Sequence, residues 1–314
     1  MVVPALDLFL SPLVLLSSLL MKVVRRLGIQ RMALSRLIFR WIGIFPLQDH
    51  YYDPFFQTHK LKRDLRLVRP LPGIDWNPAG QLLLLDQFHY LGELKEIPME
   101  EPSSLSFFSA NPFFGPGDGE FLYQMIRHFH PAKIVEVGCG FSTLLALQAI
   151  KKNKTDLPGY PCDLTGIDPY PVSWLKDLPI RMLRQSADTV DQQIFLQLKS
   201  GDFLFIDSSH MIRPQGEVLY LILEILPLLN PGVIIHFHDI FSPADYPESW
   251  IKKEMRFWNE QYLLEGFLSG NRGFRILGAL SYLHIFFPEK LAEVCPVLAK
   301  TPEHLPGSFW IQRC

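Results

Sequence analysis

Cysteine is scarce in this sequence of 314 residues, which contains only Cys139, Cys162, Cys295 and Cys314. The four lie far apart and no two form a Cys-x-x-Cys pair, so the pattern indicates neither a zinc knuckle nor a thiol redox motif. Reduced thiols are the simplest interpretation, and they favour a cytoplasmic protein.

A long uncharged run is also missing. The run from Leu8 to Met21 has 14 residues and we expect Pro12 to interrupt it, whereas a transmembrane helix needs about 20. Asp7 precedes the run where a secretory signal would carry basic residues, and no small-residue cleavage site follows. The sequence therefore favours neither a membrane-spanning helix nor a cleaved signal.

A strong net charge is absent too, but the charge is unevenly distributed. The whole chain carries −2, while residues 1–69 hold eleven Lys and Arg against four acidic residues, an excess of seven that leaves −9 for the rest. From Lys22 to Ile44 arginines are mixed with large apolar residues, which is typical of a basic amphipathic helix on an anionic membrane surface. We expect a cytoplasmic protein that can lie peripherally on the inner face of a membrane.

Helices packed on the rest of the chain, or on a second subunit of a homo-oligomer, are an equally good interpretation of this segment. Nucleic acid is not expected as a partner, because the basic part is strongly apolar.

The chain does contain a strand, a glycine turn and a helix in immediate succession. The short β-branched run Lys133 to Val137 predicts a buried parallel strand that ends at Gly138. Apolar residues at helical spacing follow, with Ser142 and Thr143 suited to begin the helix. Main-chain N–H groups at such a turn can bind a ligand.

The spacing of the glycines narrows the choice of ligand. The dinucleotide fingerprint needs a third glycine where this chain has Thr143. The pattern is instead Glu136-x-Gly138-x-Gly140-x-Ser142-Thr143. Asp168 ends the next predicted strand, residues 164–167, and a carboxylate there is placed to accept both hydroxyls of a ribose.

These residues resemble motif I and the following acidic motif of class I S-adenosylmethionine-dependent methyltransferases. The resemblance implies that Gly138 and Gly140 flank the methionine part of the cofactor, that Glu136 orients the loop and that Asp168 holds the ribose. The predicted cofactor-binding residues are Glu136, Gly138, Gly140, Ser142, Thr143, Asp168, Gln185 and Ser186, the last two at the place where the family contacts adenine.

Strands and helices alternate from residue 118 onward. Further strands are predicted at 180–183, 202–206, 233–238, 274–277 and 308–312, and helices at 81–94, 118–129, 217–229 and 250–268. This alternation predicts an α/β fold with a doubly wound sheet. The resemblance implies seven strands, mostly parallel, with an antiparallel hairpin of the last two at one edge. We expect a helical extension over residues 1–100 and an S-adenosylmethionine-binding domain over 101–314.

Two polar clusters follow the fourth and fifth predicted strands, where open α/β sheets bind ligands. They are Asp207-Ser208-Ser209-His210 and His236-Phe237-His238-Asp239. Carboxylate and imidazole ligands suit Mg, Mn or Fe better than structural zinc. We expect His236 to be a buried, hydrogen-bonded histidine.

The clusters resemble, more narrowly, the metal-dependent O-methyltransferases that act on macrolide sugars and the related cephalosporin-hydroxylase-like group. That resemblance implies that Asp207, His238 and Asp239 bind a divalent cation and that His210 is the general base. The family has Glu where this chain has His238, which raises Mn or Fe relative to Mg.

The leading hypothesis is metal-assisted O-methylation of a hydroxyl on a sugar-containing or amphiphilic small molecule, with a lipid-linked acceptor allowed by the apolar front. N-methylation and carboxyl methylation stay open. The alternatives are a non-haem iron oxygenase, in which His210, His238 and a carboxylate hold the iron, and a catalytically inactive membrane-associated scaffold.

Overall fold

The computed structural model describes residues 2–314, which form two compact units, one ending at Asp64 and one running from Leu65 to Cys314. The first unit contains α1 (Val2–Leu27), α2 (Ala33–Ile42) and a short 3-10 turn, Thr58–Lys60. The α1 helix continues through Pro12, so the interruption predicted there is wrong. The segment Val3–Leu27 has a mean hydropathy of 1.9 and is long and apolar enough to cross a membrane.

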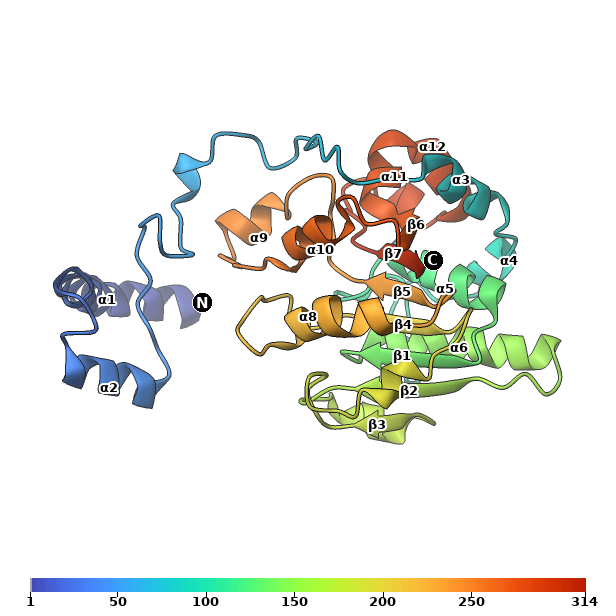
Figure 1. Ribbon diagram of the computed structural model, residues 1–314, viewed down its shortest axis with the longest axis horizontal. Helices are drawn as coiled ribbons and strands as arrows, with labels where there is room; N and C mark the ends of the chain where they lie inside the picture. Colours follow the sequence, from blue (N-terminus) through green and yellow to red (C-terminus); the bar gives the residue numbers. More distant parts are fainter. Residues whose placement is uncertain (1) are drawn as a thin grey trace. The chain divides into compact units, whose positions relative to one another are not determined.

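The second unit is built on a seven-stranded sheet in the order β3-β2-β1-β4-β5-β7-β6 (Figure 1). All pairs are parallel except β5 with β7 and β7 with β6, which are antiparallel. The doubly wound, mostly parallel sheet with a final antiparallel hairpin is thus confirmed. The strands are β1 (Lys133–Val137), β2 (Asp163–Ile167), β3 (Arg181–Leu183), β4 (Phe203–Ile206), β5 (Ile234–Phe237), β6 (Phe274–Ala279) and β7 (Phe309–Arg313).

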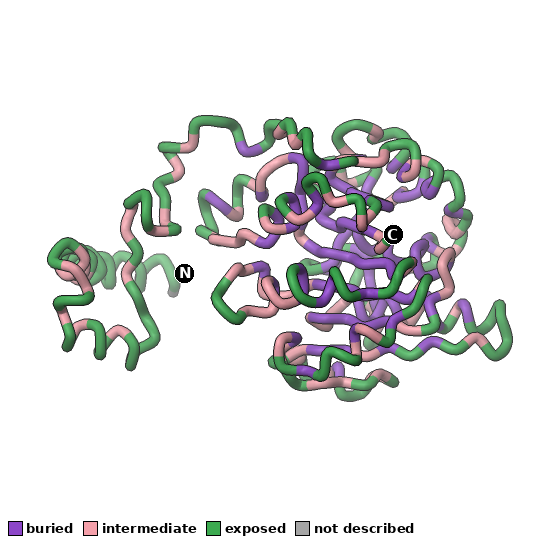
Figure 2. Tube along the Cα trace, in the orientation of Figure 1, coloured by how far each residue is buried: buried purple, intermediate pink, exposed green. Residues whose placement is uncertain are grey.

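Alternate residues of the central strands enter two different cores, because successive side chains of a strand point to opposite faces. In β4, Phe203 and Phe205 join one cluster, which includes residues of α5 and α6, while Leu204 and Ile206 join the other. Every residue of β4 and β5 is buried (Figure 2). The remaining helices are α3 (Pro78–Asp86), α4 (Leu91–Leu94), α5 (Asp118–Phe129), α6 (Phe141–Asp156), α7 (Gln193–Leu196), α8 (Glu217–Leu219), α9 (Glu248–Lys252), α10 (Glu260–Leu268), α11 (Leu280–Phe286) and α12 (Pro288–Val294).

Three predicted helices differ from the observed ones. Residues 81–94 form α3 and α4 with a break between them, and the helix predicted at 217–229 is α8 continued by a π-helical segment, Tyr220–Ile225, and a 3-10 turn. The long helix predicted at 250–268 is wrong, because α9 and α10 are separated by residues 253–259.

That break has a visible cause. Met255 adopts a positive φ of 53°, and the Arg256 guanidinium lies 4.2 Å from the ring centre of Trp250 and 4.5 Å from that of Trp258. Arginine over aromatic faces is a favourable contact. Asn259 accepts a hydrogen bond from the Ile212 N–H at 2.6 Å, which ties the segment to the loop after β4.

Residues 65–100 pack on the sheet unit, although the predicted extension ran to residue 100. The Asn77 side chain donates to the Ile276 carbonyl at 2.9 Å, and the Ala279 N–H donates to Gln81 at 2.7 Å. These bonds join α3 and the residue before it to β6. The chain divides into its two compact units between Asp64 and Leu65.

Leu221 and Leu223 of the π-helical segment offer a matched test of this core, since Leu221 is fully buried and Leu223 is 50% exposed. We expect Leu221→Ala to lower the free energy of unfolding by about 2–5 kcal/mol because it leaves a cavity. Leu223→Ala should change it by no more than about 0.5 kcal/mol. Denaturant unfolding checks both, and equal effects would contradict the assigned orientation.

Candidate active site

The glycine turn after β1 is fixed by contact with the end of β4. Gly138 has a φ of +78°, and a Cβ atom there would lie 1.8 Å from the Asp207 carbonyl oxygen. The Gly138 N–H donates to the Ile167 carbonyl at 2.9 Å, and the Asp207 N–H donates to the Val137 carbonyl at 2.8 Å. Three strand ends therefore meet at a point where only glycine fits.

Glu136 holds the turn from inside. Its carboxylate is buried and accepts hydrogen bonds from Ser142 Oγ at 2.6 Å and Thr143 Oγ1 at 2.8 Å. Burial raises the pKa of Glu136 to about 8, although the two hydroxyl groups act against this. Both hydroxyl groups donate to Glu136. The side chains of Ser142 and Thr143 therefore shape the turn.

A cavity of about 650 Å³ opens at the carboxyl ends of β1, β2 and β4, a volume typical of small-molecule sites. Of the predicted cofactor-binding residues, Gly138, Asp168 and Ser186 line it, while Gln185 is exposed and lies outside the lining. Asp168 accepts hydrogen bonds from the N–H groups of Cys139 at 3.3 Å and Tyr170 at 2.7 Å, which orient its carboxylate.

The lining also includes residues that the sequence did not single out for the cofactor, namely Ser208, Ser209, Arg213 and Glu217. Ser208 Oγ and Ser209 Oγ are buried and have no hydrogen-bond partner within residues 2–314. Buried hydroxyls are normally paired, so these two are available to a ligand. A Cβ atom on Gly140 would meet nothing within 4 Å, which leaves room beside the N-terminus of α6. These features fit S-adenosylmethionine.

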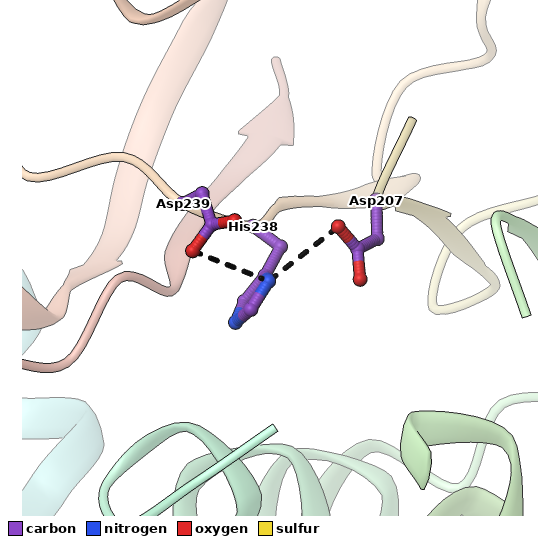
Figure 3. A group of neighbouring side chains, drawn as sticks. All are labelled: Asp207, His238 and Asp239. Atoms are coloured by element: carbon purple, nitrogen blue, oxygen red, sulfur yellow. Dashed lines mark ion pairs between the residues drawn. The ribbon is translucent and has the colours of Figure 1, made fainter. Parts of the chain in front are cut away.

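A cluster of metal-binding character lies beside this cavity. Ligand atoms of Asp207, His238 and Asp239 all lie within 4.8 Å of one another. His238 Nδ1 is 3.5 Å from Asp207 Oδ1 and 3.6 Å from Asp239 Oδ1 (Figure 3). Burial would raise the pKa of Asp207, but the imidazoles of His238 and His210 outweigh it and hold that pKa well below its ordinary value.

The second ring nitrogen of His238, Nε2, faces Asp118, the first residue of α5. His238 Nε2 is 3.6 Å from Asp118 Oδ2, and Asp118 also accepts hydrogen bonds from the N–H groups of Gly307 and Ser308. Burial would lower the pKa of His238, but Asp239, Asp207 and Asp118 raise it well above its ordinary value. An acid behind a histidine in this way is typical of metal-binding histidines.

His210 reaches the same cluster from the loop after β4. Its Nε2 is 3.4 Å from Asp207 Oδ1 and 3.6 Å from Asp239 Oδ2, and its Nδ1 is 2.8 Å from Glu260 Oε2. Burial would lower the pKa of His210, but hydrogen bonds to Asp207 and Glu260 raise it to about 10. The Trp258 ring covers it at 4.3 Å between centroids.

Glu260 was missed in the sequence because it fell inside a helix predicted to run without a break. In the structure it is the first residue of α10, and both its N–H and that of Asn259 donate to the His210 carbonyl. Only the break between α9 and α10 turns its carboxylate toward His210. Asp118 was missed as well. Its contact with His238 depends on how α5 packs beside the end of β5, and the sequence of the helix does not reveal that packing.

His236 does not join the cluster of Asp207, His238 and Asp239. It is fully buried, pairs through Nε2 with Ser308 Oγ at 3.0 Å and stacks on Phe205 with ring centroids 3.9 Å apart. Burial lowers its pKa well below the ordinary value. These contacts are those expected of a buried, hydrogen-bonded histidine.

The two glycines of the turn should respond differently to alanine. Gly138→Ala forces a side chain against the Asp207 carbonyl at a positive φ, and we expect it to lower the free energy of unfolding by about 2–4 kcal/mol. Gly140→Ala, with open space around it, should change stability by less than about 1 kcal/mol. Thermal and denaturant unfolding compare the variants, and a Gly138→Ala protein as stable as the parent would contradict the close contact.

Comparison with known proteins gives a family for this region. Residues 135–240 match the family described as "Methyltransferase domain". An uncharacterized protein of Archaeoglobus fulgidus is 28% identical over 159 residues, which is 48% of this chain and 69% of that protein.

Two solved structures are also similar. An O-methyltransferase from Bacillus cereus in complex with SAH has 11% identity and a TM-score of 0.38, over 74% of this chain and 91% of that one. A CmcI structure with Mg and SAM has 14% identity and a TM-score of 0.30, over 71% of this chain and 84% of that one. The match over 135–240, together with the observed strand order, shows that the chain contains a class I S-adenosylmethionine-dependent methyltransferase domain.

Proposed function

We propose that this methyltransferase acts on a hydroxyl oxygen with the help of a divalent cation held by Asp207, His238 and Asp239. The observation that carries the proposal is the position of Asp207, which lines the 650 Å³ cavity and also belongs to the metal-binding cluster. The cofactor would bind in the cavity on one side of the Asp207 carboxylate. The cation and the acceptor oxygen would bind on the other side of the same carboxylate.

The cluster suits a hard or borderline cation. It offers two carboxylates and one imidazole, a set that fits Mg, Mn or Fe, and the nitrogen ligand favours Mn or Fe. Because Asp118 faces Nε2 of His238, the other ring nitrogen, Nδ1, would be the one that binds the cation. Such a cation would lower the pKa of a hydroxyl bound to it and orient that hydroxyl.

S-adenosylmethionine supplies an already activated methyl group, so the protein has to align the acceptor oxygen and take its proton. His210 is placed for the second task, since Glu260 holds its Nδ1 and its Nε2 faces Asp207 and Asp239. Asp207 and Glu260 raise the pKa of His210, and a divalent cation bound by Asp207 would neutralise one of these two carboxylates.

The acceptor is best described as a sugar-containing or amphiphilic small molecule. The apolar and basic N-terminal unit supports the amphiphilic character. The oxygenase alternative would use His210 as a ligand, and it has less support because the group of mutually close ligand atoms consists of Asp207, His238 and Asp239 without His210. The scaffold alternative is disfavoured by the intact glycine turn and its Glu136 support.

Calorimetric titration tests the binding half of the proposal. Chelator-treated protein should bind S-adenosylmethionine, and adding Mg, Mn or Fe(II) should change the affinity because Asp207 is shared. Asp239→Asn removes a ligand outside the cavity lining, so it should weaken the metal effect about tenfold or more while binding without metal stays within a few fold. Metal-independent binding in the parent protein would count against the cation.

Substitution of His210 tests the chemical half. We expect His210→Ala to lower methyl transfer from labelled S-adenosylmethionine to a panel of glycosides and phenols by about 10²–10⁴-fold, the usual contribution of general base catalysis. S-adenosylmethionine binding should stay within a few fold. His89→Ala, which changes an exposed histidine, serves as the control and should leave turnover unchanged. Lost cofactor binding with normal turnover would refute the assigned role.

A further inference from the structure

The α1 helix has a long uncharged section. From Leu8 to Met21, about four turns, it carries no charged residue, and its polar side chains there are those of Ser11, Ser17 and Ser18. Helices of this kind are found inside large proteins or inside membranes. Here the apolar window is 0% buried within the structure, and its leucines are exposed, as the green trace of α1 in Figure 2 shows.

The length of α1 matches the apolar part of a bilayer. Residues 2–21 include one charged residue, Asp7, close to the end of the helix, and 20 helical residues extend about 30 Å, the thickness of the hydrocarbon layer. Pro12 is tolerated in such helices. Ser11 Oγ donates to the Asp7 carbonyl at 2.7 Å and Ser17 Oγ to the Val14 carbonyl at 3.0 Å, so these hydroxyls are satisfied within the helix.

The α2 helix has a different character, because it is apolar on one side only. None of its residues is buried, and Trp41 is 85% exposed. Arg36 and Arg40 lie one turn apart, off the apolar stripe. A narrow apolar stripe opposite basic residues is typical of a helix that lies flat in the interface, where Trp is enriched. The stripe consists of Leu34, Leu37, Ile38, Trp41 and Ile42.

The charges around these helices have one sign. Between Lys22 and Arg40 there are six basic residues and no acidic one. Arg25 pairs with Asp53 at 2.6 Å. The other five are exposed: Lys22, Arg26, Arg31, Arg36 and Arg40. A basic segment directly after an apolar helix fixes the side of the membrane on which the following chain stays and attracts anionic lipids.

We propose that α1 spans a lipid bilayer and that α2 lies in the interface of an anionic leaflet, with the Leu65–Cys314 unit on the same side as α2. The occupant of both apolar surfaces is phospholipid. Neither the assignment of methyl transfer nor the cation site enters this argument, so the two proposals fail separately.

The full chain should be reconstituted into vesicles of phosphatidylcholine, with and without phosphatidylglycerol, and floated on a density gradient. We expect the protein to stay with the vesicles after a high-salt wash and after an alkaline carbonate wash. Release by either wash would show surface attachment only and would overturn the spanning helix. A protein that is soluble without lipid or detergent as a closed oligomer would overturn it too, since a second copy would then cover the helices.

Two sets of variants sharpen the test. Leu15→Arg places a charge in the middle of α1 and should lower the alkali-resistant membrane fraction by roughly 100-fold. Gln30→Arg adds the same charge outside both helices and should leave it unchanged. Arg36→Gln and Arg40→Gln should each weaken the preference for vesicles with phosphatidylglycerol by about fivefold.

Two controls keep the outcomes interpretable. Near-ultraviolet circular dichroism should be the same for each variant and the parent, so that a folding defect is not mistaken for lost insertion. Intact mass of the protein recovered from cells should include α1. Membrane retention of Leu15→Arg at the parent level, or a recovered chain that lacks α1, would overturn the proposal.

Discussion

The carboxyl ends of β1 and β4 approach so closely that position 138 has no room for a side chain. The Gly138 turn and the Asp207 backbone are held together by contacts of the main chain. Everything polar in the site depends on this junction. It aims the β1 turn at the cavity, it places the Asp207 carboxylate at the edge of that cavity, and it brings the loop that carries His210 over the sheet.

Around that junction the protein collects carboxylates and imidazoles in a largely buried space. Asp207, His238, Asp239 and His210 are close enough to set one another's protonation, and Asp118 and Glu260 face the two histidines from behind. Burying so many ionisable groups is costly unless each has a partner. The supports come from the beginnings of α5 and α10, so these helices contribute to the geometry of the site as well as to the core.

The amino-acid sequence was sufficient for the sheet and for the residues at its strand ends. Short buried runs ending at Gly138, Asp168 and Asp207 are typical of parallel strands, and parallel strands bring their carboxyl ends to one edge. The partners of those residues were beyond reach, because they depend on tertiary packing. Glu260 meets His210 only through a break that Arg256 and its two tryptophans stabilise. The continuity of α1 through Pro12 was also missed, since local propensity alone argues against it.

Asp207 belongs both to the cavity lining and to the cluster that it forms with His238 and Asp239, and this has a thermodynamic consequence. If a cation in the cluster changes the affinity of a ligand in the cavity, the ligand must change the affinity of the cation by the same factor. The occupancy of the cation site and the occupancy of the cavity would then always change together. The cellular supply of a metal ion would set how readily the protein takes up its organic ligand, and the abundance of that ligand would set how firmly the protein retains the ion.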